Sequence, residues 1–255
     1  MSKWESQLEQ YFSMLEKIRK DKSGLRFNKS FIIASDIALQ YFCEKKIEMM
    51  FVQGDVETES KILGAEAHER LLQDIPEIKM RDLWAEIYGK KPILVLEMLV
   101  LAHYKGIVLA GRPDSILFTG GVPKMIFEYK FTRSRRPFKN HHVQAQTYGV
   151  ILRNMEFDTK NLFYALVLVN PKAEKDKELK KRVYEAVTRN GLEEATMSVK
   201  NARIYINKFN EDIAERDIDW ALEFWKYERE AFQTTNPNKC ESCEYSIVCQ
   251  MKAAE

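Results

Sequence analysis

Residues 106–131 read GIVLAGRPDSILFTGGVPKMIFEYKF, and this stretch decides the fold class. It contains two runs rich in Val, Ile, Leu and Phe, Gly106–Phe118 and Lys124–Phe131, and a third run, Ile93–His103, precedes them. Turn residues separate the three runs at Tyr104–Gly106 and Thr119–Lys124. Short runs of strand-forming residues with turn signals between them predict an antiparallel three-stranded meander.

Helical patterns surround this meander. Apolar residues recur at helical spacing over residues 3–20, which predicts an amphipathic helix. Ser35 is the expected N-cap of a helix through Cys43 to about residue 51. Further helices are expected at about 58–74, 80–89, 137–154, 175–199 and 211–233, and strands at 161–170 and 202–209. The order predicts an α/β fold with a mixed central sheet flanked by helices.

The composition limits the class of protein. The chain has 255 residues, 45% hydrophobic and 31% charged, with a net charge of only +2. This apolar content supports a folded core, and a nucleic-acid site must come from a local cluster of charge. The longest apolar run, Ile93–Ala102, is interrupted by Glu97 and falls short of the roughly 20 residues that span a bilayer. We therefore expect a soluble cytoplasmic protein that acts at no membrane.

Charged side chains interrupt the last strand of the meander. Positions two apart share one face of a strand, so Glu128 and Lys130 should point together, away from Tyr129. Asp114, which follows the neighbouring strand, could meet Glu128. Paired carboxylates repel each other, and a hard divalent cation removes that repulsion. The pattern predicts a Mg²⁺ or Mn²⁺ site in which Lys130 assists a hydrolytic water. The alternative is a structural salt-bridge cluster.

Two helical motifs accompany these strands. His68 lies one helical turn after Gly64, which would allow close approach to the sheet, and His68 could supply a nitrogen ligand. Gln144 and Tyr148 are also one turn apart, and they equally suit an ordinary amphipathic helix. We expect His141 and His142 to be surface residues rather than ligands.

A basic segment begins where the predicted metal site ends. Residues 130–142 read KFTRSRRPFKNHH, without an acidic residue and with Phe138 available for stacking. Positive charge beside a divalent-metal site suggests a phosphate backbone as substrate. The candidate DNA-binding residues are Arg133, Arg135, Arg136 and Lys139. A solvated charged loop is the competing interpretation.

The cysteines suggest a second metal centre. Cys240, Cys243 and Cys249 form a C-x-x-C-x5-C pattern near the C-terminus, and Cys43 lies in the N-terminal fifth of the chain. Structural zinc sites usually pair two cysteine knuckles, and Cys43 has no cysteine neighbour. An iron–sulfur cluster accepts an irregular triplet with one distant ligand. Spacing alone leaves cluster and zinc nearly equal, and unrelated core cysteines are the third alternative.

The ordered motifs GxxxH, GxxD, ExK, QxxxY and the cysteine triplet, over about residues 35–249, resemble the RecB-like branch of the PD-(D/E)xK nuclease superfamily. More narrowly, they resemble the CRISPR-associated iron–sulfur exonucleases, the Cas-four family. The resemblance implies a restriction-endonuclease-like core and a [4Fe–4S] cap that joins the N- and C-terminal regions. It implies metal ligation by His68, Asp114, Glu128 and the Tyr129 carbonyl, and catalysis by Asp114, Glu128, Lys130, Gln144 and Tyr148. Cys43, Cys240, Cys243 and Cys249 would hold the cluster.

The same resemblance implies a DNA exonuclease, acting 5′ to 3′ on single strands or single-stranded ends, with endonuclease activity in some members. Its expected partners are CRISPR integrase proteins. One alternative is a catalytically silent DNA-end-binding adaptor, and another is a recombination, repair or viral iron–sulfur nuclease outside CRISPR. We expect one nuclease domain over 1–255, with a helical region at about 1–60, a core at about 61–210 and a C-terminal helix and cysteine tail at about 211–255.

Overall fold

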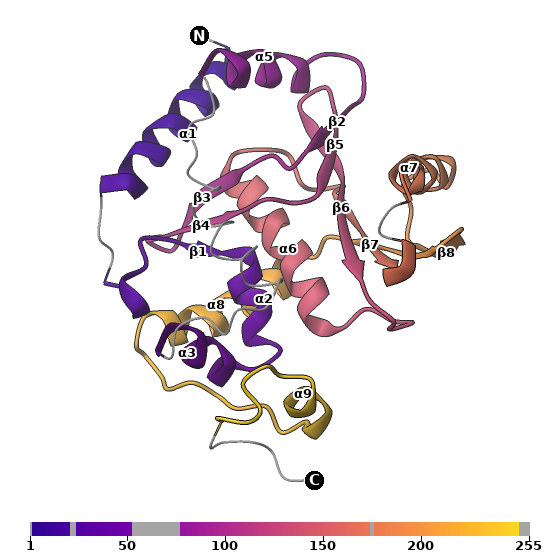
Figure 1. Ribbon diagram of the computed structural model, residues 1–255. Coiled ribbons are helices and arrows are strands. Elements are labelled where there is room, and N and C mark those ends of the chain that lie inside the picture. Colours follow the sequence, from indigo (N-terminus) through magenta and orange to yellow (C-terminus); the bar gives the residue numbers. More distant parts are fainter. Residues whose placement is uncertain (1, 21–23, 53–76, 174–175, 250–255) are drawn as a thin grey trace.

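The computed structural model describes residues 2–20, 24–52, 77–173 and 176–249, which form two mixed sheets with helices around them (Figure 1). The six-stranded sheet has the order β2-β5-β6-β7-β9-β8, and the three-stranded sheet has the order β1-β4-β3. The strands are β1 Ile32–Ile33, β2 Ile93–Leu96, β3 Val100–Tyr104, β4 Ile107–Gly111, β5 Ser115–Thr119, β6 Val122–Phe131, β7 Phe163–Val169, β8 Ala195–Val199 and β9 Ala202–Lys208. The expected α/β fold with a mixed sheet is confirmed.

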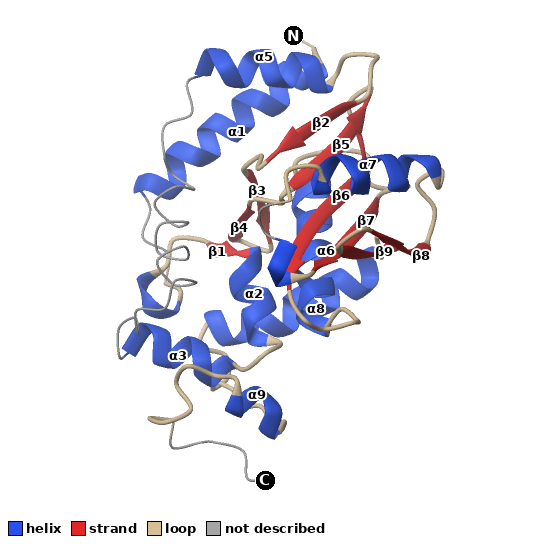
Figure 2. Ribbon diagram, turned by 45° about the vertical axis from the view of Figure 1, so that its right-hand side comes forward, coloured by secondary structure: helices blue, strands red, loops and turns tan. Residues whose placement is uncertain are grey.

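Helices cover both faces of the larger sheet (Figure 2). The α-helices of the described residues are α1 Lys3–Lys20, α2 Ala34–Gln40, α3 Glu44–Val52, α5 Glu77–Ile87, α6 Lys139–Asn154, α7 Leu179–Arg189, α8 Glu211–Trp225 and α9 Pro237–Glu241. On β6, Ile126 belongs to the larger core with α6 and α8, whereas Met125 and Phe127 belong to a second core under α7. Alternate residues of β6 therefore face different helices, as the pleat of a strand requires.

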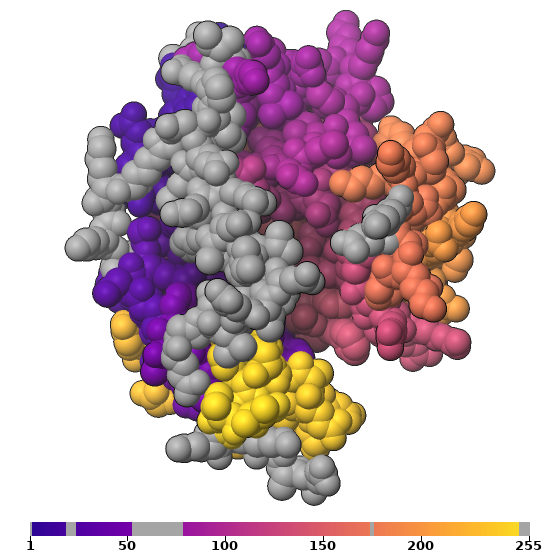
Figure 3. Space-filling view, in the orientation of Figure 1, coloured from indigo at the N-terminus to yellow at the C-terminus, as the bar shows by residue number. Residues whose placement is uncertain are grey.

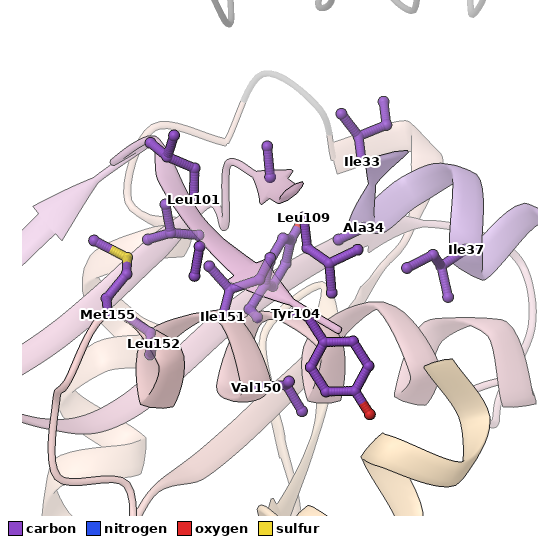
Figure 4. Packing of buried hydrophobic residues seen from close by; sticks show 14 of the residues in the cluster. Ile33, Ala34, Ile37, Leu101, Tyr104, Leu109, Val150, Ile151, Leu152 and Met155 are labelled. Carbon is purple, nitrogen blue, oxygen red and sulfur yellow. The ribbon is translucent and has the colours of Figure 1, made fainter. Parts of the chain in front are cut away.

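Helix α6 connects the parallel strands β6 and β7, which pair from Met125 with Phe163 to Phe131 with Val169. Its buried residues Val150, Ile151 and Leu152 pack with Leu101 and Leu109 of the small sheet (Figure 4). Parallel strands need a long crossover connection, and an α-helix usually supplies it. The packing fixes α6 across both sheets and so positions its first turns beside the end of β6.

The predicted meander is wrong in detail, because its first two strands each divide between the sheets. Strand β2 pairs with β5, and β3 pairs with β4. Glu97 has a φ of 46°, a conformation that bends a strand, and Pro113 has no N–H to donate. The Glu97 N–H still donates to the Asp114 carbonyl at 3.2 Å. The double bend therefore places Asp114 at the junction of the two sheets.

The predicted helix at about 35–51 is also wrong, because it divides into α2 and α3 at residues 41–43. The reason is tertiary. The Glu44 N–H donates to the Phe232 carbonyl at 3.2 Å, and the buried Glu44 carboxylate pairs with Arg229 at 2.6 Å. The N-cap is Ile33 rather than Ser35. The C-terminal segment thus accepts the hydrogen bond from the Glu44 N–H that would otherwise continue a single helix.

Two later helices are shorter than predicted. The expected helix at 175–199 is α7 followed by β8, because Gly191, with a φ of 75°, ends the helix in the left-handed region. The expected helix at 211–233 stops at Trp225, and Tyr227 also has a positive φ. The expected helix at about 58–74, with Gly64 and His68, lies outside the described residues.

The C-terminal segment lies against α2 and α3 below the sheets, at the opposite end of the molecule from the N-terminus (Figure 1), and its yellow residues lie beside indigo ones (Figure 3). Arg229 donates to both Glu44 oxygens, at 2.6 and 2.8 Å. Lys46 pairs with Glu244 at 2.9 Å, and Lys239 donates to the Tyr41 carbonyl at 2.8 Å. The two bonds from Arg229 offset the cost of burying the Glu44 carboxylate. These contacts fasten the cysteine tail to the corner between α2 and α3.

Candidate active site and cysteine cavity

The structure brings Asp114, Glu128 and Lys130 together at the bend between the sheets. Asp114 Oδ2 accepts a hydrogen bond of 2.7 Å from the Tyr129 N–H. Lys130 Nζ lies 2.8 Å from Glu128 Oε1, which confirms that the two side chains share one face of β6. The Tyr129 side chain packs on the opposite face, with the core under α7. Two carboxylates and one ammonium therefore converge as the sequence predicted.

Helix α6 supports this cluster. Lys130 Nζ donates to Gln144 Oε1 at 2.7 Å, and Gln144 Nε2 donates to the Tyr148 hydroxyl at 2.9 Å. Tyr148 in turn donates to the Arg112 carbonyl at 3.4 Å. Gln144 therefore holds Lys130, and Tyr148 holds the backbone at Arg112, two residues before Asp114.

The Tyr148 ring explains why the first residue of the GxxD motif, Gly111, is a glycine. A Cβ added to Gly111 would lie 2.5 Å from the Tyr148 ring, a separation that packed atoms cannot adopt without movement. Tyr148 itself is buried. Burial raises the pKa of its phenol, and the nearby Glu128 carboxylate adds to the rise. Tyr148 therefore remains a neutral hydrogen-bond donor at physiological pH.

Burial dominates the electrostatics of the two carboxylates. Glu128 is only 5% exposed, and burial raises its pKa to about 7, opposed by the Lys130 ammonium and increased by Asp114. Burial also raises the pKa of Asp114, opposed by the Tyr129 N–H and Lys130. Each rise reflects the free-energy cost of holding a negative charge away from water. Without a cation, the site disfavours its own ionised form.

The donor set fits a hard divalent cation. Glu128 Oε2 is buried and has no hydrogen-bond partner. This oxygen has therefore lost its hydrogen bonds to water and gained none from the protein. Mg²⁺ and Mn²⁺ prefer oxygen ligands of this type. Within residues 2–20, 24–52, 77–173 and 176–249, no three His, Cys, Asp or Glu side chains stand close enough together to hold an ion. The expected third ligand, His68, lies outside the described residues.

The side chains of the basic segment have different surroundings. Arg133 and Arg135 line an open groove of about 500 Å³. Arg136 is exposed but does not line this groove, and Lys139 forms an ion pair with Asp217. Phe138, the residue expected to stack on bases, is 56% exposed. The four predicted DNA-binding residues thus separate into a groove pair, one exposed arginine and one paired lysine.

The histidines after this segment are less exposed than predicted. His141 is buried, and its Nδ1 accepts the Phe138 N–H at 3.4 Å. Burial lowers the pKa of His141 to about 4, and the Lys130 charge adds to this effect. His142 Nδ1 lies 2.9 Å from the Tyr164 hydroxyl. The expectation of surface residues is wrong for His141, because the first turn of α6 packs against the sheet.

All four cysteines line one cavity, between the start of α3 and the C-terminal tail. Each is half-buried and free of disulfide bonds. Burial raises the pKa of Cys243 to about 11, lowered by Lys46 and raised by Glu244, Cys43 and Cys249. Cys43 therefore lies near the C-terminal triplet despite its distance in the chain, although within the described residues the four cysteines form no group that could hold a metal ion.

Sequence reasoning missed two basic residues around the site. Arg203 on β9 lines the same groove as Arg133 and Arg135. Lys180 on α7 lies near enough to Asp114 to lower its pKa, and its ammonium is 5.9 Å from the centre of the Tyr129 ring. The alternation of polar residues in ARIYINK (202–208) puts Arg203 on the polar face of its strand, but the local sequence cannot show which groove that face lines.

The site thus combines a mixed sheet, an Asp, a Glu and a Lys at its bend, and a supporting Gln–Tyr helix. A family model described as the PD-(D/E)XK nuclease superfamily matches residues 32–250, and the chain belongs to this superfamily. Its members are typically metal-dependent nucleases that use divalent ions such as Mg²⁺ or Mn²⁺.

No curated protein matches the chain. A solved structure titled "Crystal structure of SSO0001" is similar, with a TM-score of 0.45 and 16% identity, covering 98% of this chain and 95% of that one. A likeness at this level carries no argument about the activity of this chain. No helix within the described residues is long and apolar enough to cross a membrane.

Proposed function

We propose that this protein hydrolyses phosphodiester bonds in DNA at the cluster of Asp114, Glu128 and Lys130. One observation carries the proposal. A continuous polar chain runs from Glu128 through Lys130 and Gln144 to Tyr148, and it leaves one buried oxygen, Glu128 Oε2, without a partner. A buried oxygen without a partner costs free energy, and a bound cation would supply that partner.

The residues have separate tasks in the proposed reaction. A bound Mg²⁺ or Mn²⁺ would supply a Lewis acid and favour hydroxide at neutral pH, held by Asp114, Glu128, the Tyr129 carbonyl and His68. The Tyr129 N–H fixes the Asp114 carboxylate. Lys130 is positioned by Glu128 and Gln144, so its ammonium can orient the attacking water and stabilise charge on the phosphate.

We propose a finer role from the ordered motifs. The substrate is single-stranded DNA or a single-stranded end, the direction is 5′ to 3′, and the product is a trimmed end for CRISPR spacer integration by integrase partners. The alternative is a recombination, repair or viral iron–sulfur nuclease outside CRISPR, which would act through the same residues. Residues 1–255 would act as one nuclease domain, which the contact of Glu44 with Arg229 supports.

The cysteine cavity would hold a [4Fe–4S] cluster bound by Cys43, Cys240, Cys243 and Cys249. The support is the shared cavity and a donor set of four thiols. Within the described residues these cysteines form no group that could hold a metal ion, and the choice of a cluster over zinc comes from the family resemblance. The cluster would be structural, joining the tail to α3.

The test is a cleavage assay with anaerobically purified protein, Mn²⁺ and single-stranded DNA labelled at either the 5′ or the 3′ end. The native protein should release the 5′ label first as short products. Asp114→Asn and Glu128→Gln should each abolish cleavage, whereas Glu9→Gln, an exposed carboxylate on α1, should cleave normally. Full activity in both site variants would overturn the proposal. Tight binding by native protein without cleavage would support the silent adaptor instead.

A further inference from the structure

The open groove at the ends of β6 and β7 has a composition suited to a phosphate backbone. Its charged lining residues are Arg133, Arg135 and Arg203. Its polar lining residues are Thr132, Ser134, Asn170, Ser198 and Asn201. No Asp or Glu of the described residues belongs to this lining. By contrast, the groove on α8 is lined by four acidic residues, Asp212, Glu215, Asp219 and Glu223, and by one basic residue, Arg216, so the surface separates a positive groove from a negative one.

Strand register connects this groove to the catalytic lysine. Lys130 pairs with Leu168, Leu168 pairs with Arg203, and Arg203 pairs with Ser198. Directly paired residues project from the same face of a sheet, so Lys130 and Arg203 share one face. Two strand spacings of ~4.8 Å separate their backbones by about 10 Å. A nucleic-acid strand at Lys130 can therefore continue along this row to Arg203 within a few nucleotides.

The loop that carries the other two arginines is held in place. The Tyr205 hydroxyl, on the same face as Arg203, donates to the Arg135 carbonyl. The Ser134 N–H donates to Thr132 Oγ1 at 3.1 Å, and the Ser134 hydroxyl donates to the Arg136 carbonyl at 2.7 Å. These bonds fix the backbone while the guanidinium groups stay exposed. A preorganised cationic loop binds with less loss of entropy than a mobile one.

We propose that this groove, with Arg203 as its distal contact, binds the backbone of single-stranded DNA beyond the cleaved phosphate. The inference rests on the proposed nuclease function and extends it, because it assigns a path for the strand and a residue on β9 that the basic segment does not contain. Arg203 acts in binding and does not touch the reacting atoms.

The test compares Arg203→Ala with Arg189→Ala, an exposed arginine on α7 whose ion pair with Glu185 is 3.8 Å long. Binding of a fluorescein-labelled oligonucleotide is measured by anisotropy in metal-free buffer over a series of salt concentrations. Arg203→Ala should weaken binding about tenfold and reduce the slope of log affinity against log salt by about 0.7, the value for one phosphate contact on a single strand. Arg203→Lys should restore most of that slope, and Arg189→Ala should match native protein.

The outcomes separate the two proposals. If native protein cleaves DNA and Arg203→Ala binds as well as Arg189→Ala, the groove inference fails and the nuclease stands. If Arg203→Ala loses affinity but native protein never cleaves, the groove stands and the nuclease fails. Absence of DNA binding by the native protein overturns both. Loss of affinity in Arg203→Lys equal to that in Arg203→Ala contradicts a charge-based contact.

Discussion

Replacing Glu128 with Gln should stabilise the metal-free protein at alkaline pH. The native carboxyl has a pKa of about 7 against an ordinary 4.5, mainly because it is buried. A rise of this size corresponds to about 3 kcal/mol, since each tenfold change in proton affinity is worth ~1.4 kcal/mol. The folded state therefore binds the Glu128 proton more tightly than the unfolded state does. The stability from this neutral carboxyl is complete below pH 4.5 and is lost as the pH rises through 7.

The amide introduced by Glu128→Gln keeps the shape of the native side chain and an oxygen that can accept from Lys130, but it never ionises. We expect Glu128→Gln to unfold roughly 6–12 °C above native protein at pH 8 in chelator, from ~2–4 °C per kcal/mol for a chain of this size. At pH 4.5 the two should unfold together. Adding Mn²⁺ at pH 8 should raise the unfolding temperature of native protein and leave that of Glu128→Gln unchanged, because binding to the folded state alone stabilises it.

The measurement is thermal unfolding followed by circular dichroism at several pH values, with and without Mn²⁺. Glu9→Gln removes an exposed carboxylate from α1 and serves as the control, with the unfolding temperature of native protein expected at each pH. A native protein that is more stable than Glu128→Gln at pH 8 in chelator would refute the reasoning. A difference that does not depend on pH would refute it equally.

Gly111→Ala should lose about 2 kcal/mol or more in chemical denaturation and most cleavage activity, because the new methyl group overlaps the Tyr148 ring; equal stability would contradict the tight contact. Arg229→Ala should cost about 3–5 kcal/mol, since it leaves the Glu44 carboxylate buried with fewer partners; urea unfolding checks this, and a loss no larger than that of Arg189→Ala argues against it. Cys249→Ser should lose the broad absorbance near ~400 nm that thiolate-bound iron gives; native protein that contains zinc and no iron would exclude the cluster.

Local sequence patterns predicted the site residues because each pair lies within a single strand or a single helical turn. Alternation along β6 places Glu128 and Lys130 on one face, and helical spacing places Gln144 beside Tyr148. The order of the motifs then predicted which elements meet. The proximity of Cys43 to the C-terminal triplet was predicted from the cysteine pattern, and the family resemblance then favoured a cluster over zinc.

Long-range contacts account for what the sequence did not predict. The break after Gln40 depends on Arg229 and Phe232, far along the chain. The division of the meander depends on a positive φ at Glu97, which no local signal requires of a glutamate. Arg203 reaches the basic groove only through the pairing of three strands. Register of this kind is a property of the assembled sheet and not of one segment.

The most direct test of the central claim is single-turnover cleavage of single-stranded DNA by native protein and Lys130→Ala, with Mn²⁺ and protein in excess. Lys130 contacts both Glu128 and Gln144, so its loss removes the group that orients the water and leaves the carboxylates in place. We predict that native protein cleaves, that Lys130→Ala still binds DNA with its fold intact, and that its cleavage rate falls by ~10²-fold or more. Equal rates for the two proteins would contradict a catalytic site at Asp114, Glu128 and Lys130.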